Sequence, residues 1–251
     1  MTLKPSLAAG LVSLLLAAPS LALAAEQGPS SSYAKEATMN QEQQLTQRQQ
    51  AMIPVASFAA AGDLDALEGA LRDALDAGMT VNDGKEVLVQ LYAYAGFPRS
   101  LNALGTFMKV VEGREKQGIE DDMGATPNRP IPKGDELLAR GTANQTELAG
   151  QPVEGPLFEF APAADEYLKT HLFGDIFARD NLSWRDRELA TVAMLSSLQG
   201  AEPQLRAHMG MAMNTGLSEA QLRQLTEVLA ERVGATSAER ARRALQTHLN
   251  K

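Results

Sequence analysis

The chain has 251 residues, with 31 acidic residues against 23 basic ones, a net charge of −8, and no cysteine. The negative charge opposes binding to nucleic acids and to anionic membrane surfaces, so neither is expected as a partner. The lack of cysteine excludes disulfide bonds and any mechanism that needs a thiol nucleophile. Stability therefore has to come from a buried core and from contacts between subunits.

The first 24 residues have the composition of a secretory signal peptide. A short basic start at Lys4 precedes an apolar run over residues 7–18 and the small-residue motif Ala-Leu-Ala that ends at Ala24. The run is too short, and too closely followed by this motif, for a membrane span, so we expect cleavage after Ala24. Residues 25–40 are polar and are predicted to form a flexible spacer. The mature protein is expected in the periplasm or outside the cell, without membrane association.

The next region, residues 41–118, carries the signals of four successive helices. Glycines at positions 62, 78 and 96 are placed to end helices, and Thr80 is placed to cap the start of the third one. The fourth predicted helix begins near Pro98, because proline suits the first turn of a helix. This region is predicted to be one compact helical unit.

A proline- and glycine-rich stretch separates this unit from a second one. Residues 119–161 are predicted to be a linker, with at most one helical turn at residues 137–140. Helical patterns resume over residues 162–251, in which residues 184–214 are predicted to form a helical hairpin. No window alternates between apolar and polar residues as a strand does, so the predicted fold class is all-α.

The two helical regions align with each other at a constant offset of 138 residues. Residues that begin or end helices recur in both: Gly62 with Gly200, Gly78 with Gly216, Met79 with Leu217, Thr80 with Ser218, Leu91 with Leu229, and Gly96 with Gly234. Agreement at one register indicates an internal duplication of a unit of about 75 residues.

Both copies resemble the carboxymuconolactone decarboxylase family. GMTVNDGKEVLVQLYAYAGFPRSLNAL in the first copy resembles the latter half of its domain, and RDRELATVAML with LRAHMGMAMNTGLSEAQL in the second resembles the former half. The resemblance implies an all-α fold of two tandem repeats, assembly into homotrimers or hexamers and, for some members, decarboxylation of a lactone acid. Other members are peroxidases in which two cysteines lie seven and four residues before a histidine. Those positions here are Ala201 and Gln204, so the peroxidase mechanism is disfavoured.

Glu188 and His208 are the candidate catalytic residues of the second copy. Glu188 shares an apolar helix face with Val192 and Leu195, and His208 lies on the apolar face of the next helix. Counting along the hairpin does not place the two side chains level, so we expect their contact to need helix bending, a second subunit, or a bridging water or substrate. A purely structural buried pair is the alternative.

The two copies have lost opposite parts of the repeat. The offset places Gln50 and Ala70 where the second copy has its Glu and His, whereas the aromatic helices of the first copy have no counterpart in the second. We therefore predict a composite site in which Tyr92, Tyr94 and Asn102 bind substrate beside the Glu and His of the second copy.

Arg185 and Arg206 are candidates to hold a substrate carboxylate through paired hydrogen bonds. An exposed salt bridge is the alternative role for each. The three histidines form no metal-binding spacing, so neither a metal nor an organic cofactor is expected.

The sequence thus predicts a cofactor-independent lyase or isomerase that acts on a small carboxylated or lactone-like molecule through Glu and His acid–base chemistry. Two alternatives remain open at this point. One is an alkyl hydroperoxidase-type antioxidant, and the other is a non-catalytic periplasmic binding or assembly protein.

Overall fold

The structure, a computed structural model, describes residues 44–250, and within that range every regular element is a helix and no strand is present. The predicted signal peptide, the whole predicted spacer and the first residues of the first predicted unit, residues 1–43 in all, lie outside the described residues. None of the helices between residues 44 and 250 is both long enough and apolar enough to cross a bilayer. The all-α fold class is confirmed.

The first copy of the repeat comprises four helices. They are α2 (Gln47–Ala61), α3 (Leu64–Asp76), α4 (Val81–Gln90) and α5 (Tyr92–Lys116). The first two end close to the predicted glycines, Gly62 and Gly78, but the third ends at Gln90, six residues before the predicted end at Gly96. Side chains of Thr46, Asp63 and Thr80 accept hydrogen bonds from backbone N–H groups at the helix starts. Gly96 interrupts α5 with φ of 82°, a left-handed conformation that favours glycine, so the predicted break before Pro98 is present.

The second copy repeats this arrangement at the predicted offset. Its helices are α9 (Trp184–Ser196), α10 (Glu202–Asn214), α11 (Glu219–Arg232) and α12 (Ala235–Leu249). Each of α10 and α11 begins 138 residues after α3 and α4, respectively. Ser218 and Gln221 form the predicted capping box at the start of α11. The internal duplication is therefore visible in the helix boundaries as well as in the sequence.

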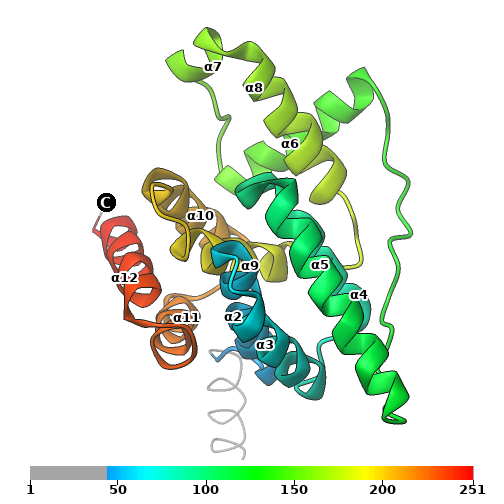
Figure 1. Cartoon of the computed structure of the whole chain (residues 1–251). Helices are drawn as coiled ribbons and strands as arrows, with labels where there is room; N and C mark the ends of the chain where they lie inside the picture. The colour runs from blue at the N-terminus through cyan, green and yellow to red at the C-terminus, as the bar shows by residue number, and fades with distance from the viewer. Residues whose placement is uncertain (1–43, 251) are drawn as a thin grey trace, which may run out of the picture. The chain divides into compact units, whose positions relative to one another are not determined.

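The two copies share one core around α2 and α9, the first helices of the two copies. These two helices pack directly against each other, and α3, α10, α11 and α12 surround them (Figure 1). The Ser57 hydroxyl donates to the Ala193 carbonyl oxygen at 3.1 Å across the α2–α9 contact. Because both helices are buried on nearly all sides, neither copy has a complete core without the other.

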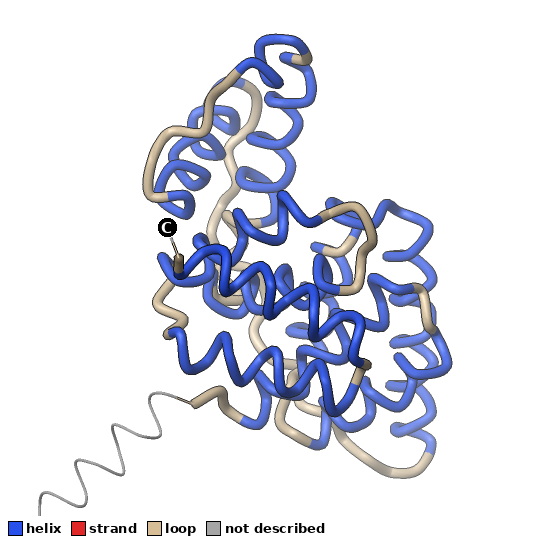
Figure 2. Tube along the Cα trace, turned by 90° about the vertical axis from the view of Figure 1, so that its left-hand side faces the viewer, coloured by secondary structure: helices blue, strands red, loops and turns tan. Residues whose placement is uncertain are grey.

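The segment between the copies is largely helical, and here the sequence-based prediction of a linker with at most one turn is wrong. It contains α6 (Asp135–Ala149) and α7 (Pro156–Phe160). It is followed by α8 (Pro162–Tyr167) and a π-helix, η1 (Leu168–Ile176), where the sequence predicts that helical patterns resume. These helices pack against one another at one end of the body, as both views show (Figure 1, Figure 2).

Close packing of α6 on η1 explains why proline and glycine content misled the prediction. A Cβ atom at Gly141 in α6 would lie 1.8 Å from the carbonyl oxygen of Lys169, so glycine is required where these helices meet. The contact encloses a second, smaller apolar cluster that consists of Leu148, Leu172, Phe173, Ile176, Phe177 and Met211. The inserted helices therefore belong to the folded body and are not a loose connection.

Candidate functional site

Glu188 and His208 are in direct contact. Glu188 lies on α9 and is fully buried, and its Oε2 atom is 2.8 Å from Nδ1 of His208 on α10. Glu188 lies eight residues before the last residue of α9, and His208 lies six residues after the first residue of α10. This difference of two residues is only about 3 Å along a helix axis. The prediction that the hairpin alone could not place them level is wrong, because it counted the loop residues 197–201 as if they lengthened α9.

The two nitrogens of the His208 ring have different surroundings. When Glu188 is a carboxylate, which only accepts hydrogen bonds, the tautomer that fits this contact has the proton on Nδ1. Nε2 makes no hydrogen bond within the described residues and, unlike Oε1 of Glu188, it is not sealed from solvent. With Nδ1 protonated, the neutral ring presents a lone pair at Nε2.

Tyr94 of the first copy packs against this pair. Its ring meets the His208 ring edge-on, with centroids 5.5 Å apart and an interplanar angle of 80°. The Thr191 hydroxyl lies 3.3 Å from the phenol oxygen. Burial, together with the nearby Glu188 carboxylate, raises the pKa of Tyr94 well above its usual value, so the phenol stays protonated at neutral pH. The structure thus brings one aromatic residue of the first copy to the Glu and His of the second.

Tyr92 lies elsewhere, although it is only two residues from Tyr94. It stacks on Phe97 at a centroid distance of 4.4 Å and meets the ring of His171 in η1 edge-on. Two residues correspond to a rotation of about 200° around a helix, so the two tyrosines point in nearly opposite directions. Asn102, further along α5, is exposed and contacts neither Glu188 nor His208 through any hydrogen bond.

The two candidate arginines also lie apart from the pair. Arg185 donates to Oε1 of Gln221 at 2.7 Å and lines a hollow of about 350 Å³ with Trp184 and Asn214. Arg206 is exposed on α10 and lines a different hollow, between α10 and α12. Neither hollow includes Glu188 or His208.

A buried ionic network beside the pair was missed by sequence reasoning. Arg187, which is fully buried on α9, donates to Oε2 of Glu86 on α4 at 2.9 Å. Arg179 makes a second ion pair with the same carboxylate at 2.6 Å. Burial alone would raise the pKa of Glu86, but the hydrogen bonds from the two arginines outweigh it and hold that pKa below its usual value.

This network is connected to Tyr94 through Gln90 and Thr191. The side-chain amide of Gln90 donates to the Thr191 hydroxyl at 2.7 Å and to the Arg187 carbonyl oxygen at 3.0 Å. A usable signal was present in the sequence. Glu86 and Gln90 are four residues apart, as are Arg187 and Thr191, so each pair places two polar side chains on one face of its helix.

No three His, Asp or Glu side chains between residues 44 and 250 are grouped closely enough to hold a metal ion. At the site, only two such side chains, Glu188 and His208, lie together among the described residues. They share one hydrogen bond, and the second ring nitrogen of His208 takes no part in it. The arrangement supplies an acid and a base without any further group.

Comparison with known proteins assigns the family. The model of the carboxymuconolactone decarboxylase family matches residues 32–107 and again residues 162–247. No curated protein sequence gives a significant match. The two matched regions coincide with the two copies of the repeat and together cover more than half of the chain. This protein therefore belongs to the carboxymuconolactone decarboxylase family, and it contains the family's domain twice.

Proposed function

We propose that the protein is a cofactor-independent lyase or isomerase that acts on a small carboxylated or lactone-like molecule, with Glu188 and His208 as its acid–base pair. The observation that carries this proposal is the 2.8 Å hydrogen bond from His208 to a fully buried carboxylate, combined with an Nε2 atom that lacks a protein partner. A carboxylate that holds one ring nitrogen leaves the other oriented for proton transfer.

The proposed chemistry needs only what these residues supply. In decarboxylation, the electrons of the breaking carbon–carbon bond move into the carbonyl group or conjugated lactone of the substrate as carbon dioxide leaves. Protonated His208 then delivers a proton from Nε2 to the carbanionic carbon. In isomerisation, neutral His208 removes a proton at one carbon and returns it at another. Glu188 keeps the ring oriented and stabilises its positive charge.

A peroxidase function is not supported by this site. The positions of the two cysteines in thiol-dependent relatives are held by Ala201, which precedes α10, and by the exposed Gln204. Neither side chain can attack a peroxide. The non-catalytic alternative, in which the family's pocket binds a molecule without turnover, uses the same residues. The experiment below distinguishes it from an enzymatic function.

The test is a screen of lactones and keto acids with the wild type, His208→Ala and Glu188→Gln. Gln50→Ala is the matched control, because Gln50 stands at the position of Glu188 in the first copy and only donates to the Leu45 carbonyl oxygen. We expect turnover of at least one compound, a loss of about 10²- to 10⁴-fold in kcat in both site variants, and no loss in the control.

Other outcomes count against the proposal. Turnover that survives in His208→Ala contradicts the assigned pair. Saturable binding without turnover by the wild type supports the binding-protein alternative. Peroxide consumption with a thiol reductant that is lost in His208→Ala supports the peroxidase.

We also propose that the protein is exported after cleavage behind Ala24 and that it assembles into homo-oligomers, with trimers as the expected state. Exposed apolar side chains on α5, at Phe97, Leu101 and Met108, support self-association, since their spacing places them on one helix face. N-terminal sequencing of the periplasmic protein tests the cleavage, and light scattering on the eluting protein tests the assembly. An intact N-terminus or a monomeric mass contradicts the respective proposal.

A further inference from the structure

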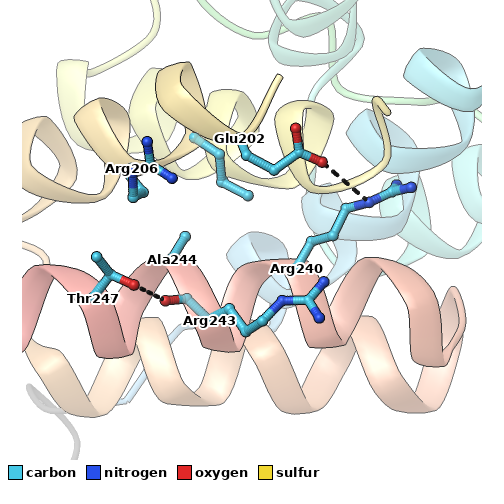
Figure 3. A pocket seen from close by; sticks show the side chains of 7 residues that line it. Glu202, Arg206, Arg240, Arg243, Ala244 and Thr247 are labelled. Carbon is cyan, nitrogen blue, oxygen red and sulfur yellow. Dashed lines mark hydrogen bonds and ion pairs between the residues drawn. The ribbon is translucent and has the colours of Figure 1, made fainter. Parts of the chain in front are cut away.

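The hollow between α10 and α12 is lined by an unusual number of arginines. It has a volume of about 190 Å³, and three arginines line it, Arg206 on α10 and Arg240 and Arg243 on α12. Glu202, Leu205, Ala244 and Thr247 complete the lining. Figure 3 shows Arg206 and Glu202 on one wall and the two arginines of α12 on the opposite wall.

The positive charge in this hollow is only partly compensated. Glu202 is its single carboxylate and lies 3.9 Å from Nε of Arg240. Arg243 has an exposed neighbour, Glu239, at 3.8 Å, outside the lining. Arg206 makes no hydrogen bond or ion pair with any part of the chain that the structure describes. By contrast, arginines that serve the fold, such as Arg114, contact their carboxylates at 2.8 to 3.0 Å.

Such a concentration of positive charge opposes folding unless something offsets it, since like charges on facing helices repel. It is also local, because the chain as a whole carries a charge of −8. Arginines on two walls provide paired N–H donors, the geometry that matches a carboxylate or a phosphate group. The volume lies below the range of about 300–1,000 Å³ that is typical for drug-sized ligands.

We infer that the hollow is a binding site for a small oxyanion, either a short organic acid or a phosphate-bearing molecule, held by Arg206 and Arg243 on opposite walls. Arg240, which is partly buried and lies near Glu202, also lines the site. The site is separate from the acid–base pair, since His208 meets Glu188 on α9 while Arg206, two residues earlier on α10, lines the hollow toward α12. This assignment changes the role predicted for Arg206 from holding the substrate of the reaction to holding an anion at a second site.

The test is isothermal titration calorimetry at low ionic strength with inorganic phosphate and, separately, with citrate. The variants are Arg206→Ala, Arg243→Ala and their combination. Arg242→Ala is the matched control, because Arg242 is an exposed residue of the same helix that does not line the hollow. We expect saturable binding of at least one anion, about tenfold weaker binding in each single variant, and a larger loss in the combination.

The control variant and His208→Ala should bind the anion as the wild type does, which separates this site from the proposed reaction. The inference is overturned if neither anion binds at concentrations up to about 10 mM. It is also overturned if the combined variant binds as tightly as Arg242→Ala. A vesicle arm distinguishes the source of the anionic group: binding to vesicles of phosphatidylglycerol and phosphatidylcholine, without binding of either free anion, contradicts a small-molecule site.

Discussion

The two copies of the repeat have the same helices in the same order, but they bury different chemistry where they meet. The third helix of each copy faces the first helix of the other copy. In one of these two contacts, α4 of the first copy faces α9 of the second, and Glu86 pairs with the buried Arg187. In the other, α11 faces α2, and the equivalent positions carry Gln224 and Gln49. The Gln224 side chain accepts only the backbone N–H of Leu45, at 2.7 Å.

This difference shows that the two copies of a duplicated unit can take different roles. The charged contact lies beside Tyr94, Glu188 and His208, whereas the neutral contact has Gln50 in place of the glutamate. Because each copy covers the core of the other, the copy that lacks the Glu and His pair still contributes packing, the Glu86 carboxylate and one aromatic side chain, Tyr94. The first copy supports the candidate site, and the second copy carries its acid and base.

Among the variants that test this comparison, the one that removes the negative charge of the buried ion pair should change the free energy of unfolding the most. Glu86→Gln leaves Arg187 buried without a compensating charge, so we expect a loss of about 3–5 kcal/mol in the free energy of unfolding. Gln224→Ala, at the equivalent position of the other contact, should cost only about 1 kcal/mol. Urea unfolding at neutral pH measures both values, and equal losses would show that the two contacts do not differ.

The same pair should make stability depend on acid. The pKa of Glu86 is lower in the folded protein than its usual value of 4.5. A carboxyl group of this kind contributes stability above its unfolded pKa, and that contribution disappears as the pH falls through its folded pKa. The stability advantage of the wild type over Glu86→Gln should therefore shrink from about pH 5 downward. An advantage that stays constant to pH 3 contradicts the assignment.

A third prediction asks whether the inserted helices belong to the body that the two copies form. Gly141→Ala places a methyl group against the Lys169 carbonyl oxygen, so α6 and η1 must separate, at a cost of about 1–3 kcal/mol. Gly105→Ala in α5 is the control, since nothing lies within 4 Å of its added Cβ. The control should be neutral or slightly stabilising. If both variants unfold at the wild-type urea concentration, the α6–η1 contact does not contribute.

The smallest predicted effect distinguishes the two tyrosines of the first copy. Tyr94→Phe keeps the ring against His208 but removes the hydroxyl beside Thr191, so we expect a three- to tenfold loss of kcat/KM on the substrate that the screen identifies. Tyr92→Phe should have no effect, because Tyr92 packs on Phe97 and His171. Unchanged kinetics in both variants would remove the composite site.

Ultraviolet titration gives a second readout that needs no substrate. The chain has four tyrosines, and the raised pKa of Tyr94 makes it ionise late. The step at the highest pH should be absent in Tyr94→Phe and present in Tyr92→Phe. A late step that persists in Tyr94→Phe contradicts the burial of this phenol beside Glu188.

Local signals in the sequence were enough to establish the helices of both copies, the duplication and the family. Thr80 and Ser218 cap helices, and Gly62, Gly96 and Gly216 end or break them, through hydrogen bonds and backbone angles that involve only near neighbours. Such signals act over a few residues, so they can be recognised without a structure. The choice of Glu188 and His208 also came from a local pattern, their position on apolar helix faces.

Packing between distant segments established the rest. The helix over residues 135–149 forms because Gly141 lets α6 approach η1, although its composition resembles that of a linker. The direct bond between Glu188 and His208 and the placement of Arg206 in a separate hollow depend on how helices of the second copy pack against each other. The buried pair of Glu86 with Arg187 depends on how helices from both copies cross. The free energy of these contacts comes from burial and from charges brought together in space, and neither quantity can be read from spacing along one chain.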